Sequence, residues 1–288
     1  MTESARTYDV IIVGGGPVGL FLAIILLKKG IECIVLEKRT ERTTHSKSLG
    51  IHPVSLELMD QMKIADPFVK EGIKIRRGVA LDDHGKIGSI SFDSCPGPFP
   101  YVLSLPQYRT EYLLEKQLEK LDASCLRRGV EFQDLNQTNM SVSVTVKEGE
   151  NTYQLSARVL AGCDGKNSVV RQSTGFSFEG RAYPDTYIMG DFSDTTDFGT
   201  SAAIYLHSRG LIESFPLIDN RRRWVIKTDQ YYDDLNRRHL EKILRERIGL
   251  SLNGCDHFML SSFGVQKHLA KPIARNRVFT WLEILRML

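Results

Sequence analysis

The chain has 288 residues, a formal net charge of +3 at pH 7 and 42% hydrophobic residues. So small a charge gives no reason to expect a nucleic acid or an anionic membrane as a partner. A chain of this length and composition can bury a sizeable core, and we expect it to form two lobes.

The cysteines and the N-terminus indicate the compartment. Five cysteines occur without a C-x-x-C pair, which is typical of reduced thiols and not of disulfides or zinc ligands. The apolar run from Leu20 to Leu27 is too short to span a bilayer, and no charged-then-apolar leader opens the chain. The expected location is therefore cytoplasmic.

A glycine-rich motif lies near the N-terminus. The run from Val10 to Val13 is followed at once by Gly14, Gly16 and Gly19 in the spacing G-x-G-x-x-G, which predicts a buried strand and a tight turn into a helix. Gly14 would permit the turn, Gly16 would leave room for a pyrophosphate, and Gly19 would let the helix pack closely on the strand. Pro17 suits the first turn of a helix, where its missing N–H costs nothing.

The same segment continues into a second strand. The helix is expected to run to about Lys29, with Gly30 ending it, and the apolar run 33–36 then leads to Glu37. A carboxylate at this spacing accepts hydrogen bonds from an adenosine ribose and disfavours a 2′-phosphate, so the motif favours FAD or NAD over NADP. A glycine motif alone is a weak signal, but here the strand, the helix and the acid agree.

The middle of the chain is predicted to form helices and hairpins. A helix over 53–62 is expected to bury Val54, Leu58 and Met62, and the segments 73–81 and 87–92 should form a hairpin. Thr110 is expected to cap a helix that Gln107 precedes. The segments 141–146 and 153–162 predict a small antiparallel ribbon.

A second motif follows this ribbon, in the sequence GCDGKNSVVR. Asp164 and Gly165 predict a turn, with Asn167 or Ser168 as the cap of a short helix that runs through Arg171. The turn would place a carboxylate at the carboxyl end of a strand, where open α/β sheets bind ligands. From the residues alone, it could equally be an ordinary turn.

Beyond residue 176 the pattern changes to short strands. The segments 187–192, 203–206, 211–215 and 223–228 predict an antiparallel sheet, followed by a helix over 233–248. The run Arg221–Arg223 is interpreted as a solvated turn. Tyr205 and His207 share a strand face that could line a pocket, although a structural role is the expected one for His207.

In combination, the glycine motif, Glu37, the segment LPQYRTE and GCDGKNSVVR resemble the FAD-dependent aromatic hydroxylases, the single-component flavoprotein monooxygenases of the phenol and polyketide hydroxylase type. The resemblance covers nearly the whole chain. It implies an α/β fold with a Rossmann-like FAD-binding domain and parallel sheet in residues 1–175. The hairpin 73–92 within this range could instead belong to the second lobe. A substrate-binding lobe on an antiparallel sheet would occupy 176–265, and 266–288 would return to the first domain.

The resemblance also implies the site. The FAD pyrophosphate would lie on the loop and helix start, and Glu37 would bind the ribose. Gln107 would lie beside the flavin-side phosphate and ribityl, and Asp164 would support the region where FAD and transient NAD(P)H pass. The residues implied in cofactor binding are Gly14, Gly15, Gly16, Pro17, Val18, Gly19, Glu37, Lys38, Lys47, Gln107 and Asp164.

The implied reaction is hydroxylation of a small aromatic substrate with NAD(P)H and O2. NAD(P)H reduces FAD, the flavin captures oxygen as a C4a-hydroperoxide, and the electron-rich ring attacks its distal oxygen while the protein supplies orientation and a dry pocket. The residues identify no catalytic side chain and no metal site. They do not distinguish NADH from NADPH, nor do they define the oligomeric state.

Three departures from the family pattern are visible. Lysine stands at Lys47, where many relatives have arginine, and the second arginine expected near Val54 is missing, so phosphate contacts there should be weaker. The relatives' Gly-Asp-Ala-Ala-His motif after a strand like ARNRVF does not occur. An alternative expectation is therefore a truncated remnant that binds FAD weakly and does no turnover; a pure scaffold is a third.

Overall fold

The computed structural model describes residues 7–43 and 48–280. The chain forms two compact units: within the described residues, unit 1 comprises 7–43, 107–180 and 268–280, and unit 2 comprises 48–106 and 181–267. The boundaries expected from the sequence differ from these mainly in residues 48–106, which belong to unit 2.

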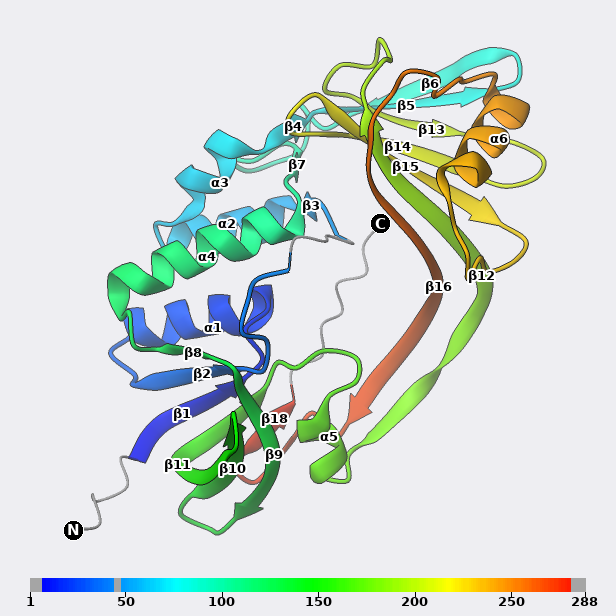
Figure 1. The fold of residues 1–288 in the computed structure, drawn as a ribbon. Helices are drawn as coiled ribbons and strands as arrows, with labels where there is room; N and C mark the ends of the chain where they lie inside the picture. The colour runs from blue at the N-terminus through cyan, green and yellow to red at the C-terminus, as the bar shows by residue number, and fades with distance from the viewer. Residues whose placement is uncertain (1–6, 44–47, 281–288) are drawn as a thin grey trace. The chain divides into compact units, whose positions relative to one another are not determined.

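Unit 1 is built on a largely parallel sheet. Its strand order is β17-β18-β11-β1-β2-β8, in which β1, β2, β8, β11 and β18 run parallel and β17 is antiparallel to β18. The helix α1 (Pro17–Lys28) lies on the sheet, and α4 (Gln107–Leu121) packs on α1 (Figure 1). The strands are β1 (Thr7–Val13), β2 (Cys33–Glu37), β8 (Leu126–Arg128), β11 (Asn151–Gly162), β17 (Ala274–Arg275) and β18 (Val278–Thr280).

The predicted ribbon is present and is larger than expected. The strand β10 (Val142–Glu148) pairs antiparallel with β11 and with β9 (Val130–Gln137), which the sequence analysis did not predict. Strict alternation along β10 buries Val142, Val144 and Val146 completely in the core of unit 1. The far end of β11 pairs with β1, so the ribbon and the parallel sheet share one strand.

Unit 2 contains a sheet with the order β16-β12-β15-β14-β13-β5-β6. Its neighbouring strands β12, β15, β14 and β13 pair antiparallel, whereas β13 and β5 pair parallel. The hairpin of β5 and β6 therefore extends this sheet. The strands are β5 (Arg77–Asp82), β6 (Gly85–Ser91), β12 (Ser177–Ser193), β13 (Ala202–Tyr205), β14 (Ile212–Leu217), β15 (Arg221–Thr228) and β16 (His257–Lys271).

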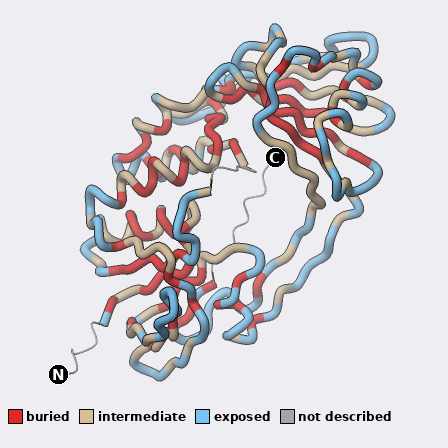
Figure 2. Tube along the Cα trace, in the orientation of Figure 1, coloured by how far each residue is buried: buried red, intermediate tan, exposed pale blue. Residues whose placement is uncertain are grey.

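One face of this sheet is covered by α6 (Arg237–Ile248). Asn236 and His239 form a capping box at its start, and Gly249 ends it with a φ of 69°, so the helix begins four residues later than 233. Its buried residues Leu240 and Leu244 pack in one cluster with Ile188, Ile212, Trp224 and Ile226 of the sheet. Figure 2 shows the buried residues of this unit concentrated in the central strands.

The remaining elements of unit 2 correct the expected face of the first helix. In α2 (Pro53–Gln61), Val54 and Leu58 are 68% and 46% exposed, and Leu56 and Met59 are buried instead. The buried side is set by packing against the neighbouring α3 (Ala65–Glu71), which the sequence analysis did not predict. A small sheet completes the unit, with the order β3 (Gly50–Ile51), β7 (Val102–Ser104) and β4 (Ile73–Ile75).

The arginine run does not form a solvated turn. The turn consists of Asp219 and Asn220, which have φ values of 62° and 52°, and the arginines open β15. Arg222 donates from Nε to Asp194 at 2.8 Å, and Arg223 donates from two nitrogens to Asp191 at 2.7 and 2.8 Å. Both guanidinium groups are almost completely buried, because alternation sends them to opposite faces where a carboxylate meets each.

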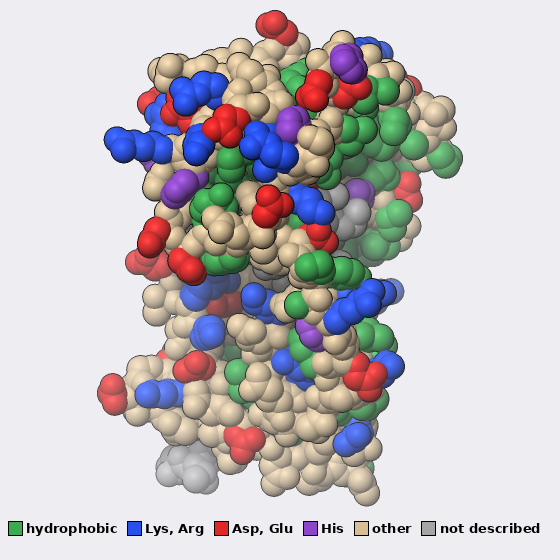
Figure 3. All heavy atoms as spheres, turned by 90° about the vertical axis from the view of Figure 1, so that its right-hand side faces the viewer, with side chains coloured by type: hydrophobic (Ala, Val, Ile, Leu, Met, Phe, Trp, Pro, Cys, Tyr) green, Lys and Arg blue, Asp and Glu red, His purple; other side chains and the backbone are tan. Residues whose placement is uncertain are grey.

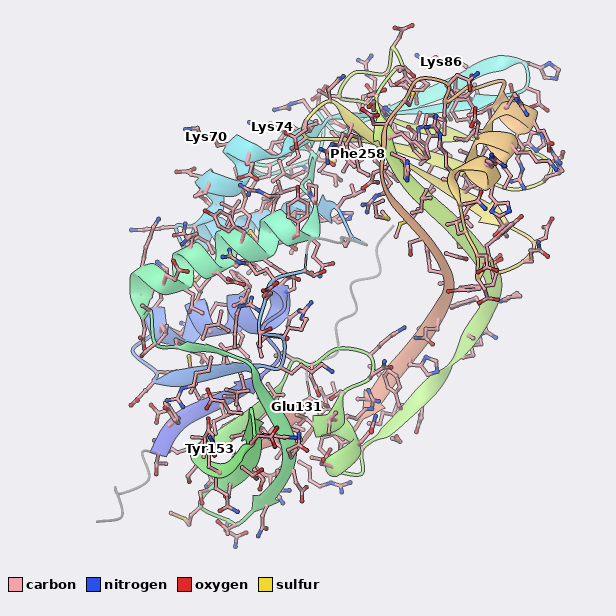
Figure 4. The ribbon with its side chains drawn as sticks, in the orientation of Figure 1. Lys70, Lys74, Lys86, Glu131, Tyr153 and Phe258 are labelled. Atoms are coloured by element: carbon pink, nitrogen blue, oxygen red, sulfur yellow. The ribbon has the colours of Figure 1, made fainter. Side chains whose placement is uncertain are left out.

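The first arginine of the run packs on an aromatic ring. The Cζ of Arg221 lies 3.5 Å from the centroid of the ring of Phe258, a residue of β16 that Figure 4 labels. Acidic and basic side chains are interspersed on the face shown in Figure 3, so that face carries no patch of a single sign. Along the described ranges, no helix combines the length and the apolar character needed to cross a membrane.

Candidate functional site

The glycine loop joins β1 to α1 at the carboxyl edge of the parallel sheet. Gly14 has a φ of +111°, and a Cβ there would lie 2.3 Å from the carbonyl oxygen of Cys163. A Cβ on Gly19 would lie 2.0 Å from the carbonyl oxygen of Gly14, so the helix packs directly against the loop. A Cβ on Gly16 would meet nothing within 4 Å. The loop is therefore crowded on the protein side and open at Gly16.

The N-terminus of α1 faces this opening without a side-chain cap. Gly16 is the N-cap residue and forms no side-chain hydrogen bond, and Pro17 opens the helix. The N–H groups of Val18 and Gly19 follow in the first turn, where helix amides have no intrahelical acceptor. Amides without an intrahelical acceptor and the helix dipole together favour an anionic group such as a phosphate at this position.

Glu37 ends β2 and points at the glycine loop. Its Oε2 accepts a hydrogen bond from the N–H of Gly15 at 2.8 Å, and its Oε1 accepts two from Arg39, at 2.9 and 3.0 Å. Burial by itself would raise the pKa of Glu37, but the hydrogen bonds from Arg39 and Gly15 hold the pKa below its ordinary value. The side chain is therefore an ionised acceptor, and Oε2 has capacity for a second donor.

Two other predicted residues add little to this geometry. Lys38 follows Glu37 and is exposed. Lys47 lies outside the described residues, so its predicted phosphate contact stays a prediction.

Gln107 is the first residue of α4 and does not precede the helix, and Thr110 lies buried within the helix instead of capping it. The helix begins directly after Pro106, three residues earlier than the expected cap. The Nε2 of Gln107 donates to Oε1 of Glu111 at 2.9 Å, which fixes the orientation of the amide on the first turn of α4.

The structure shows a buried acidic cluster on α4 that the sequence analysis missed. Glu111 is 2% exposed and Glu115 is 4% exposed. Glu115 accepts from Arg128 and lies 3.5 Å from Nε of Arg42. Burial raises the pKa of Glu111, and the hydrogen bond from Gln107 and the charge of Arg39 oppose this rise only in part. The spacing of two acids four residues apart among buried leucines was the signal that could have revealed the cluster.

Asp164 lies beside the glycine loop. The N–H of Cys163 donates to the carbonyl of Val13 at 2.7 Å, and the parallel register pairs Gly162 with Val13, so the two loops share one edge of the sheet. Oδ2 of Asp164 accepts from the N–H groups at the start of α5 (Val169–Ser173), at 2.7 and 3.2 Å. Its Oδ1 is buried and finds no hydrogen-bond partner among the described residues.

The short helix α5 begins as predicted, with Ser168 as its cap: its hydroxyl accepts from the N–H of Arg171 at 3.0 Å. His207 has the structural role expected from the sequence, and the alternative of a pocket lined by Tyr205 and His207 finds no support, since β13 ends at Tyr205. Tyr205 packs near Trp224 on the α6 side of the sheet, and Nδ1 of His207 accepts from the N–H of Arg209 within a turn.

Comparison with known proteins identifies the family. A family model described as an FAD binding domain matches residues 7–281. The chain belongs to this FAD-binding family. The described residues fit an adenine dinucleotide such as FAD, because the loop is open at Gly16, α1 lacks a side-chain cap, and Asp164 keeps an unpaired buried oxygen.

Several members of the FAD-binding family are monooxygenases. The chain is 31% identical over 279 residues to a rifampicin monooxygenase of Streptomyces venezuelae, and the alignment covers 94% of this chain and 57% of that protein. It is 38% identical over 175 residues to a 12-dehydrotetracycline 5-monooxygenase/anhydrotetracycline 6-monooxygenase of Streptomyces rimosus. This alignment covers 60% of this chain and 34% of the relative. The chain therefore spans about half or less of the length of these relatives.

Solved structures show the same fold. An anhydrotetracycline hydroxylase of Streptomyces rimosus matches with a TM-score of 0.76 at 31% identity, covering 96% of this chain and 56% of that one. An aklavinone-11 hydroxylase solved with FAD and aklavinone matches with a TM-score of 0.81 at 20% identity, covering 96% and 57%. The mixed α/β architecture predicted from the sequence is thereby confirmed.

A substitution at Glu37 tests its place in the site. Glu37→Gln keeps the shape but removes the negative charge, so we expect FAD to bind about tenfold more weakly, equivalent to about 1.4 kcal/mol. Flavin fluorescence titration measures the Kd, and the exposed Glu32→Gln in the same unit serves as the control. Equal affinities for the two variants would show that Glu37 does not contact the cofactor.

Unit 2 contains a buried carboxyl of its own. Glu213 on β14 is 4% exposed, its Oε2 has no hydrogen-bond partner among the described residues, and burial raises its pKa from 4.5 to about 7. Between these two pKa values the folded state binds more protons than the unfolded state, so rising pH reduces the stability. Above about pH 7 this loss is complete.

Glu213→Gln should remove this pH dependence. The unfolding free energy of the variant minus that of the wild type should increase by about 3 kcal/mol between about pH 4 and about pH 8. Urea denaturation at a series of pH values measures it. A difference that stays constant with pH would mean that Glu213 keeps an ordinary pKa in the folded protein.

Proposed function

We propose that this chain carries the FAD site of a monooxygenase that hydroxylates a phenolic or polyketide aromatic ring, with NAD(P)H as reductant and O2 as oxygen donor. The observation that carries the proposal is the hydrogen bond from the N–H of Gly15 to Glu37, which sets a ribose acceptor beside an open, uncapped helix start. The polyketide-modifying monooxygenases among its relatives support the choice of substrate class.

The residues of unit 1 have separate roles in this proposal. The amides of Val18 and Gly19 bind the pyrophosphate above Gly16, and Glu37 holds the adenosine ribose. Gln107, fixed by Glu111, lies toward the flavin end, and the free oxygen of Asp164 accepts a hydrogen bond from the cofactor or from NAD(P)H.

Bound flavin supplies the redox chemistry, taking electrons from NAD(P)H and activating O2. The protein binds and orients the two substrates and excludes water from them. We assign the aromatic substrate to the face of the unit 2 sheet opposite α6, because Ile204, Met189 and Val225 form a row of apolar side chains there.

The proposal is tested by purifying the protein and following its flavin. We expect yellow colour to persist through gel filtration and phenols to stimulate NAD(P)H oxidation. Protein that is folded by circular dichroism but retains no added FAD would contradict the cofactor assignment. Retained FAD without stimulation by any phenol would contradict the hydroxylase assignment and leave a binding module.

A further inference from the structure

Glu213 lies in the middle of the sheet face that α6 does not cover. Its neighbour Ile212 joins the cluster under α6, so alternation along β14 turns Glu213 to the opposite face. The register places Ile204 of β13 and Val225 of β15 directly beside it. Met189 of β12 is the next residue in the same row. A single carboxyl thus sits in a row that is otherwise apolar.

This carboxyl forms no ion pair with the residues that the structure describes. The strand β15 places three cations on the same face, and each has another partner: Lys227 pairs with Asp185, Arg223 binds Asp191 through two hydrogen bonds, and Arg221 packs on the ring of Phe258. Glu213 is more than nine-tenths buried and its Oε2 finds no partner among the described residues. Since buried polar atoms in folded proteins are nearly always hydrogen-bonded, the free oxygen indicates a partner other than the described residues.

Aromatic side chains on the same face indicate the kind of partner. Tyr187 lies two residues before Met189 on β12, and its ring stacks on Phe263 with centroids 5.5 Å apart and an interplanar angle of 15°. The charge of Glu213 is among the causes that raise the pKa of Tyr187, after burial and Asp185, so the two groups are within electrostatic range. Apolar walls, stacked rings and one acceptor suit an aromatic ring that carries a hydrogen-bond donor.

We propose that Glu213 is a specificity-determining residue whose Oε2 accepts a hydrogen bond from a hydroxyl group on the aromatic ligand. This inference rests on the proposed function, because it places the substrate on this face of unit 2. A hydroxylated ring satisfies the buried acceptor, whereas the corresponding methyl ether leaves it unpaired. A site of this kind discriminates strongly against the analogue that lacks the donor.

The test compares phenol with anisole, which has the same ring but no donor. Binding is measured by calorimetry with FAD-loaded protein and, separately, with flavin-free protein. We expect wild type to bind phenol at least about tenfold more tightly than anisole. Glu213→Met, which has similar volume and no oxygen acceptor, should bring the ratio close to one by weakening phenol alone.

Two further variants separate specificity from structure. Glu213→Gln retains a carbonyl acceptor and should recover part of the preference for phenol. Glu246→Met removes a surface carboxylate on α6 and should leave the ratio unchanged. Circular dichroism and thermal unfolding confirm that the variants fold, and removing an unpaired buried acid is not expected to lower their stability.

Each outcome decides a separate claim. A wild-type ratio near one, an unchanged ratio in Glu213→Met, or no binding of either compound would overturn the role of Glu213. In another outcome, the wild type fails to bind FAD while the flavin-free protein still prefers phenol. That result would overturn the proposed function and leave Glu213 as a phenol-binding residue.

Discussion

Gly16→Val is expected to weaken FAD binding by about 1,000-fold, or about 4 kcal/mol, while the protein stays folded. A Cβ at this position lies more than 4 Å from every described residue except its chain neighbours, because it enters the open side of the loop. The backbone φ of −80° suits valine as well as glycine. The substitution therefore fills the space assigned to the pyrophosphate, and flavin fluorescence titration measures the loss.

Two other glycines serve as controls. Gly78→Val on β5 of unit 2 also enters open space and should change neither FAD affinity nor folding. Gly19→Val should instead destabilise the protein, because its Cβ would overlap the carbonyl oxygen of Gly14. If Gly16→Val bound FAD as tightly as Gly78→Val does, the dinucleotide would not lie on this loop.

Asp191→Ala is expected to lower the unfolding free energy by about 4 kcal/mol, because it leaves a buried guanidinium without its counter-ion. Arg223 is 1% exposed and donates two hydrogen bonds to Asp191. Urea denaturation measures the loss. In the exposed pair of Lys271 and Glu179, Glu179→Ala should leave the unfolding free energy nearly unchanged.

The double variant Asp191→Leu with Arg223→Met tests the cause of this loss. Removing both charges should recover most of the stability, because no uncompensated charge then remains buried. If the double variant is as unstable as Asp191→Ala, the loss comes from packing and not from the isolated charge.

The glycine loop and Glu37 could be predicted because each depends on local sequence. Backbone geometry restricts Gly14, and the distance along the chain from Gly15 to Glu37 is one helix and one strand. A cap at Asn167 or Ser168 was predictable for the same reason, since a cap lies next to its own helix, and the structure selects Ser168.

The buried charges could not be predicted, because their partners are distant in sequence. Arg222 binds Asp194 and Arg223 binds Asp191, 28 and 32 residues away, so the arginine run alone resembles a solvated turn. The buried state of Glu213 depends on strands that pair only in the folded sheet. Packing of α2 against α3 likewise reversed the expected exposure of Val54 and Leu58.

The most direct test of the central claim is a crystal structure of the protein loaded with FAD. We expect the two phosphates above Gly16 at the start of α1 and an adenosine ribose hydroxyl within hydrogen-bonding distance of Glu37. A dinucleotide bound elsewhere, or one whose ribose makes no contact with Glu37, would contradict it.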